Sequence, residues 1–258
     1  MRTQKYAVLA ALLIGATSTM SFAEQTPYHA GQALNVWANS ANLRAAPNAE
    51  AAVVEKLSFG RAINITTVPT PAVTTPFVFY QDAADPTKPI TLNGQWLKVK
   101  AEGNEGYIID QLLLDYAPPH KESTEQYFVR TFGMKLNDSD AKKIKTKSVG
   151  KKSISFPKVT REYASPQAHL VFISIDGANN QYRESGTLTL KNYNFNKAMV
   201  FMTGIYPIVQ VTQYVPNQSL EYNYDKTPET ASVTKQGDDV VLKWMLGMPN
   251  ENSKAAVK

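Results

Sequence analysis

Short runs in which apolar and polar residues alternate recur through the second half of the chain, and turn-forming residues separate them. The clearest of these runs span 171–175, 187–190 and 220–224. A period of two places every second side chain on the same face of a β-strand, so each run predicts a strand with one buried face. Several short strands separated by turns favour a sandwich or a small barrel. The chain is therefore expected to be mainly β.

Other segments from His169 onward are assigned to the same β-rich region. Met199 to Met202 is a continuous apolar run, and Ile208 to Val215 is rich in β-branched residues. Ser232 to Lys235 and Val240 to Trp244 flank the turn sequence Gln-Gly-Asp-Asp. Two strand-like runs around such a turn predict a β-hairpin.

The first half of the chain carries a spaced motif of apolar, aromatic and glycine residues. It consists of Asn42-Leu43-Arg44-Ala45-Ala46-Pro47, Val53-Val54, Leu57, Gly60, Gln95-Trp96-Leu97-Lys98-Val99, Gly106-Tyr107-Ile108 and Leu112-Leu113-Leu114. This pattern resembles the bacterial SH3-like domain over residues 34–114. The resemblance implies a small β-barrel at 34–116, of a kind attached to cell-envelope proteins, with ligands lying across an aromatic-lined groove. Tyr107 stands where the family usually has tryptophan, so a hydroxyl replaces the indole N–H.

Residues 67–93 depart from that motif with a long insertion, where the family's barrel has a short hairpin. Five prolines in this stretch exclude a regular helix or a central strand. Long loops are usually functional or disordered, and the aromatic residues Phe77, Phe79 and Tyr80 argue against disorder. We therefore expect a loop that presents aromatic side chains.

The remaining chain divides by composition. Residues 24–33 form a polar lead-in, and a Pro-Pro linker at 117–126 is expected to join the barrel to a β-rich, sandwich-like domain at 127–247. The tail at 248–258 is polar and is expected to be flexible. The two halves are expected to fold separately, because each has apolar alternation of its own.

A cluster of polar residues precedes a lysine-rich run in the second half. Asn137 to Asp140 is a candidate helix N-cap. The run that follows includes Lys142 and Lys143 and extends to Lys152. It has two interpretations, a solvated helix face or linker and a contact with an anionic surface or an acidic partner.

The first 23 residues have the organisation of a secretory signal peptide. Arg2 and Lys5 precede an apolar run from Tyr6 to Ala16, and small residues follow at Ser21 and Ala23. The run is shorter than the ~20 residues that span a bilayer, and no other run approaches that length. Cleavage after Ala23, export to the periplasm and no membrane span are therefore expected.

Composition limits the chemistry and the partners. Removing Arg2 and Lys5 from the 27 basic residues leaves 25 against 22 acidic residues, a net charge of +3. That balance suits anionic envelope polymers and lacks the basic stripe of a nucleic-acid binder. The absence of cysteine excludes a disulfide and a thiol nucleophile. The histidines at 29, 120 and 169 lack the close spacing of zinc ligands, so neither a metal nor a cofactor is expected.

Motifs for catalysis by serine or carboxylates are weak. Ser-x-x-Lys occurs at Ser139, Ser148 and Ser232, but the supporting Ser-Asp-Asn and Lys-Thr-Gly motifs of that chemistry do not occur. Adjacent acids at 138, 140, 238 and 239 suit an N-cap and a turn, while a carboxylate pair from distant positions stays open. The chain is expected not to be an enzyme.

The expected function is binding. The candidate contact residues are Phe77, Phe79, Tyr80, Trp96, Tyr107, Lys142 and Lys143. Trp96 and Tyr107 have the alternative role of filling the barrel core. We expect an exported binding protein of the bacterial cell envelope that contacts a cell-wall peptide, glycan or protein segment. The alternative is a periplasmic immunity or inhibitor protein, whose insertion at 67–93 would block a secreted effector toxin acting on the wall or membrane.

Overall fold

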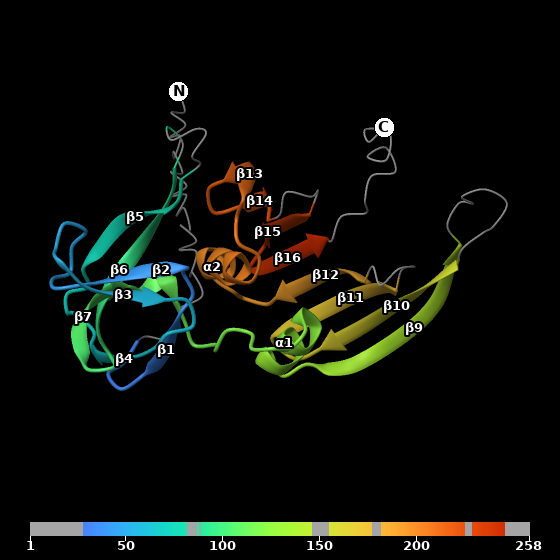
Figure 1. The fold of residues 1–258 in the computed structure, drawn as a ribbon, viewed down its shortest axis with the longest axis horizontal. Helices are drawn as coiled ribbons and strands as arrows, with labels where there is room; N and C mark the ends of the chain where they lie inside the picture. The colour runs from blue at the N-terminus through green and yellow to red at the C-terminus, as the bar shows by residue number, and fades with distance from the viewer. Residues whose placement is uncertain are drawn as a thin grey trace, which may run out of the picture.

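The computed structural model describes residues 28–81, 87, 89–145, 155–176, 182–224 and 229–245. Within these ranges the chain is mainly β, which confirms the fold class expected from alternation (Figure 1). Residues 1–27, which include the expected signal peptide, lie outside the described residues, and so does the expected tail. No helix in the described part is long and apolar enough to cross a membrane.

The N-terminal unit is an antiparallel sheet that curls around its own core (Figure 1). Its strands follow the order β3-β2-β7-β6-β4-β1-β8, and β5 pairs with β6 outside this path. The elements are β1 (Ala33–Val36), β2 (Ser40–Arg44), β3 (Val53–Ser58), β4 (Ala62–Thr67), β5 (Thr74–Tyr80), β6 (Ile90–Ala101), β7 (Asn104–Ile109), the 3-10 turn η1 (Asp110–Leu112) and β8 (Leu113–Leu114).

Alternation decides which side chains enter the core of this unit. Leu34 and Val36 of β1, and Ile63 and Ile65 of β4, are each 2% exposed or less. They belong to a cluster of twelve buried residues that come only from the N-terminal unit. Gly60 has a φ of +80° in the turn between β3 and β4, so this turn uses glycine's backbone freedom.

The expected loop at 67–93 contains a strand. β5 pairs antiparallel with the first half of β6, from Thr74 opposite Gln95 to Tyr80 opposite Ile90. β5 pairs with no other described strand, and an edge position tolerates Pro76. The insertion therefore extends the N-terminal sheet as a hairpin, and its residues 82–86 and 88 lie outside the described part.

The C-terminal unit is one eight-stranded antiparallel sheet with two helices packed on one face (Figure 1). The strand order is β13-β14-β15-β16-β12-β11-β10-β9. The elements are α1 (Thr124–Thr131), β9 (Lys135–Lys145), β10 (Ser155–Ala164), β11 (Ala168–Asp176), β12 (Tyr182–Leu190), α2 (Phe195–Ile205), β13 (Gln210–Val215), β14 (Ser219–Asn223), β15 (Thr230–Gln236) and β16 (Asp239–Met245). The expected hairpin is present as β15 and β16.

The prediction that a helix begins at Asn137–Asp140 is wrong. These residues lie inside β9, which pairs with β10, and Asn137 is the residue skipped at a shift in their register. The helix lies earlier, because Ser123 and Gln126 form a reciprocal capping box at the start of α1. Lys142 and Lys143 are therefore on an edge strand, where lysine protects the unpaired edge from other chains.

The apolar run Met199–Met202 is helical, in contrast to the β assignment. It forms the middle of α2, which Asn194 caps by accepting a hydrogen bond from the backbone N–H of Lys197 at 3.0 Å. A short apolar run does not distinguish a buried strand from a buried helix by period alone. Here the N-cap decides the outcome.

The two units share a hydrophobic core through α2. Trp37 of the N-terminal unit is 1% exposed, and its ring lies 5.1 Å from that of Phe201 in α2 and 5.4 Å from that of Phe59. Gly204 permits this approach, since a Cβ there would lie 2.6 Å from the Trp37 ring. The cluster also takes in Ile90, Leu92 and Leu114 from the N-terminal sheet. The two sheets lie on either side of residues 117–126, although α1 begins within this stretch at Thr124. The division into domains and the separate folding of the halves stay predictions.

Candidate functional site: a groove on the open face of the C-terminal sheet

The barrel aromatics expected to contact a ligand are mostly covered. Trp96 is 2% exposed, and its indole N–H donates a hydrogen bond to Thr75 Oγ1 at 3.0 Å. Tyr107 is half-buried on β7, opposite Lys98 in the sheet. Trp96 is therefore buried, although it is not among the residues of the barrel's core cluster, and little of its ring is available to a partner.

The aromatics of the insertion pack inward as well. Phe77, Phe79 and Tyr80 are half-buried and contact the shared core. The Tyr80 hydroxyl donates to the backbone carbonyl of Val209, across to the C-terminal unit, at 3.5 Å. Val78, which points the other way from β5, is 54% exposed. The three aromatics pack the β5–β6 hairpin against the shared core, and Tyr80 links it to the C-terminal unit. Their role in partner binding stays a prediction.

The two candidate lysines lie far from these aromatics, on the outer edge of the C-terminal sheet (Figure 1). Lys142 is exposed and forms a salt bridge with Asp140 at 2.6 Å. Lys143 neighbours it in β9, and its side chain is outside the described part. The seven candidate residues therefore do not converge on one site.

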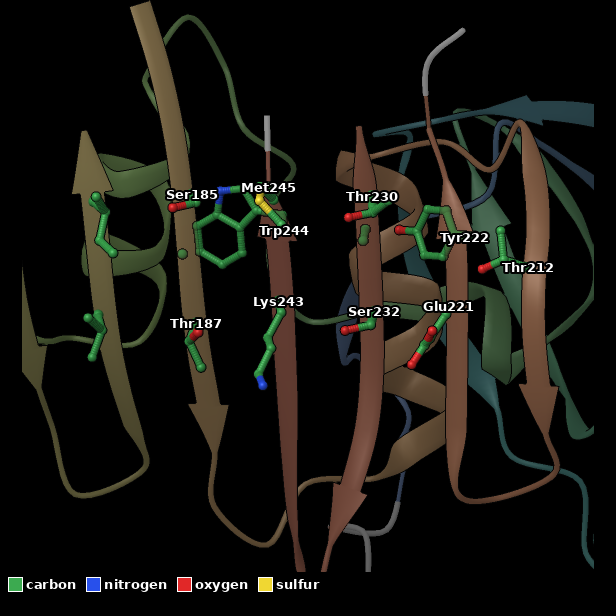
Figure 2. Close-up of a pocket in the computed structure, with 14 residues that line it drawn as sticks. Ser185, Thr187, Thr212, Glu221, Tyr222, Thr230, Ser232, Lys243, Trp244 and Met245 are labelled. Atoms are coloured by element: carbon green, nitrogen blue, oxygen red, sulfur yellow. The ribbon is translucent and has the colours of Figure 1, made fainter. Parts of the chain in front are cut away.

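The described surface does contain a groove elsewhere, which we call the sheet groove. It lies on the face of the C-terminal sheet away from α1 and α2, and side chains from β11 through β16 line it (Figure 2). Its volume is about 430 Å³, within the range of small-ligand sites.

Short hydroxyl side chains create the groove. Backbone pairing places one row of side chains across four neighbouring strands: Thr187, Lys243, Ser232 and Glu221. Ser185, Met245 and Thr230 form the adjacent row. Serine and threonine rise less far from a sheet than the long charged side chains that usually cover a solvated face. The hydroxyls therefore leave a hollow between taller neighbours, and each can donate and accept a hydrogen bond.

A bulge in the edge strand adds one more hydroxyl. The pairing of β13 with β14 shifts register between Val211 and Gln213. Thr212 is the extra residue of this bulge, and it lines the groove (Figure 2). Bulges re-aim side chains at sheet edges and beside binding sites.

The opposite face beneath the groove is tightly packed. A Cβ at Gly186 would lie 2.1 Å from the Trp244 ring, so glycine lets the indole lie directly against β12. The Trp244 ring also contacts Phe128 at 5.1 Å and Tyr206 at 6.2 Å. The groove therefore has a rigid floor, which favours a preformed site.

A buried lysine joins the two units at another place. Lys197 of α2 is 5% exposed, and its Nζ donates to the backbone carbonyls of Asp110 and Leu113, the latter at 2.8 Å. Asp110 also accepts hydrogen bonds from the Tyr28 hydroxyl at 3.2 Å and from the backbone N–H of Gln95 at 2.8 Å. Burial lowers the pKa of Lys197 to about 8, while Asp110 and Asp115 raise it. The lysine fixes α2 on η1 and β8, and nothing marks a ligand beside it.

A carboxylate cluster anchors α1 to the sheet. Glu125 accepts a hydrogen bond from the Arg161 guanidinium at 2.8 Å and from the Tyr163 hydroxyl at 2.7 Å. Burial raises the pKa of Glu184, and hydrogen bonds from Thr124 and Tyr206 oppose that shift. The arrangement positions the first turn of α1 over β10 and β12.

The histidines do not assemble a metal site in the described part of the chain. The Nε2 of His169 lies within hydrogen-bond distance of Glu162 Oε1, at 2.7 Å, on the neighbouring strand. His29 and His120 are exposed on other segments. No group of three His, Cys, Asp or Glu side chains suited to a metal ion occurs among the described residues.

Comparison with protein-family models, with curated proteins and with solved structures finds no match to this chain. The site is therefore judged on its geometry alone.

Sequence reasoning missed the sheet groove, although one signal pointed to it. Ser or Thr occupies every second position in 185–190 and in 230–234. The residues between them, such as Gly186, are buried. That alternation predicts an outer strand face of short hydroxyls. It does not reveal which strands lie side by side, and six strands line the groove.

Proposed function

We propose that this chain is an exported, non-catalytic binding protein of the bacterial cell envelope, and that the sheet groove is its binding surface. The observation that carries the proposal is an open, hydroxyl-lined hollow of about 430 Å³ over a rigid aromatic floor. Concave, preformed sites with a few polar groups are the usual sites of ligand recognition.

The chemistry of the lining supports binding more than catalysis. A serine nucleophile needs a base within hydrogen-bond reach. Ser232 and Lys243 are cross-strand neighbours, yet the described residues include no hydrogen bond between them and the Lys243 side chain is exposed.

The envelope location is supported by the signal-like residues 1–23 and by the SH3-like motif. The N-terminal unit is a small curled β-sheet with its own core, which is compatible with the barrel that the motif implies. N-terminal sequencing of the exported protein should begin at Glu24. A mature chain that still begins at Met1 would contradict export.

Capture from a solubilised envelope fraction tests the binding role. The bait is the mature chain, and Ser232→Arg fills the groove with a long side chain. Ser58→Arg, at an exposed serine of β3, is the matched control. We expect one partner to be retained by the wild type and by Ser58→Arg, and lost from Ser232→Arg. Equal retention by all three, with circular dichroism showing folded variants, would contradict a site in the groove.

The partner's identity separates the envelope function from the alternative of an immunity or inhibitor protein. That alternative depended on the insertion at 67–93, whose described aromatics pack against the shared core. A wall fragment or resident envelope protein supports the first function, and a secreted toxin supports the second.

A further inference from the structure

The row of side chains through the sheet groove carries two isolated charges of opposite sign. From β11 to β13 the row reads Val171, Thr187, Lys243, Ser232, Glu221 and Gln213. Lys243 and Glu221 are both exposed. Neither forms a salt bridge with another side chain in the part of the chain that the structure describes.

The spacing of these charges is fixed by the sheet. Lys243 and Glu221 flank Ser232, so their backbones lie two strand spacings apart, or about 10 Å. An extended peptide covers at most ~3.3–3.6 Å per residue. Three residues therefore place a free ammonium and a free carboxylate at roughly that separation.

The groups between and beside the charges suit a peptide backbone. Ser232, Thr230 and Thr187 can each donate to a peptide carbonyl or accept from a peptide N–H. Val171, Ile173 and Met245 add apolar surface at the edges of the groove for small side chains. Glycans would instead be expected to stack on exposed aromatic faces, and the outward-facing residues of the groove include none.

We infer that the sheet groove binds a short peptide of about three residues with free termini, its carboxylate at Lys243 and its ammonium at Glu221. This inference rests on the proposed function and specifies its ligand. Its side chains are small and apolar, to suit Val171, Ile173 and Met245 at the edges of the groove.

Titration of the isotope-labelled mature protein with trialanine, followed by amide chemical shifts, tests the inference. The blocked probes are N-acetyl-trialanine and trialanine amide, each of which lacks one terminal charge. We expect saturable shifts on β12, β14, β15 and β16 with trialanine, and binding about three- to fivefold weaker with either blocked probe, the scale of an exposed ion pair. Shifts confined to other strands, or none up to about 10 mM, would overturn the inference.

Charge exchange distinguishes recognition from a general effect of mutation. Lys243→Glu and Glu221→Lys should each weaken trialanine binding about three- to fivefold. The double exchange should restore it, because a free peptide can bind in the reversed direction. Both sites are exposed, so the thermal unfolding of all variants should match the wild type. A double variant as weak as the single ones, or variants that bind like the wild type, would refute the charge readout.

The outcome is separable from that of the proposed function. If envelope capture depends on the groove while trialanine fails to bind, the binding role stands and the peptide inference fails. If trialanine binds as expected while no envelope partner depends on Ser232, the ligand class stands and the envelope role fails.

Discussion

Replacing Lys197 with methionine should remove a pH dependence from the stability of the fold. Lys197 is buried at the contact between α2 and the N-terminal unit, and burial lowers its pKa from 10.5 to about 8. Between these values the folded chain holds fewer protons than the unfolded chain, so stability rises with pH. The destabilising effect of the buried charge is complete below pH 8 and is gone above 10.5.

The size of the effect follows from the shift. One pKa unit corresponds to about 1.4 kcal/mol, and integrating the two titrations from pH 7.5 to 9.0 gives a gain of about 1 kcal/mol for the wild type. Lys197→Met also leaves the carbonyls of Asp110 and Leu113 without this donor, which costs about 1–3 kcal/mol per group. The stability at one pH therefore mixes opposing effects, and the change with pH is the informative quantity.

Urea unfolding of both proteins at pH 7.5 and 9.0 measures that change. The wild type should gain about 1 kcal/mol relative to Lys197→Met over this interval. Lys191→Met, at an exposed lysine just before α2, controls for the loss of one charge and should behave like the wild type. Parallel pH profiles for the wild type and Lys197→Met would refute the assignment of a buried, titrating lysine.

Other perturbations test the packing. Phe77→Ala and Phe79→Ala should each lower stability by about 2 kcal/mol, since both are half-buried against the core, while Val78→Ala at an exposed site should leave the melting temperature near that of the wild type; no loss in the phenylalanine variants would return the hairpin to a surface role. Gly186→Ala should cost about 3 kcal/mol, because a Cβ meets the indole ring beneath β12, and an unchanged urea midpoint would contradict that contact. Burial raises the pKa of several tyrosines above the ordinary 10.0. The unfolded chain then releases their protons at a lower pH than the folded chain, so stability should fall above pH 10, and a flat urea midpoint there would contradict their burial.

Local pattern was sufficient for much of the fold. Alternation at 187–190 predicted β12, and the turn at Gly237 predicted the β15–β16 hairpin. Such patterns are local, because a strand with one buried face has apolar residues at every second position. Pattern failed where tertiary pairing decided the outcome. Asn137–Asp140 has the polarity of a helix N-cap, yet pairing with β10 makes it strand.

The candidate site was harder to predict for a geometric reason. Phe77 and Phe79 have no core position by local pattern, because the core they pack against is assembled from residues of both units that are distant in the sequence. The groove could not be predicted because no local motif in the sequence connects Thr187, Ser232 and Glu221. They become a site only when the strand order places β12, β16, β15 and β14 side by side.

Site-specific photo-crosslinking in living cells tests most directly whether the sheet groove is the binding surface. A photoreactive residue at Ser232 probes the groove, and one at Val54 probes an exposed position of β3 on the N-terminal unit. The account predicts a discrete cross-linked adduct from position 232 and none from position 54. An adduct from position 54 alone would contradict it and would place the contact surface on the N-terminal unit.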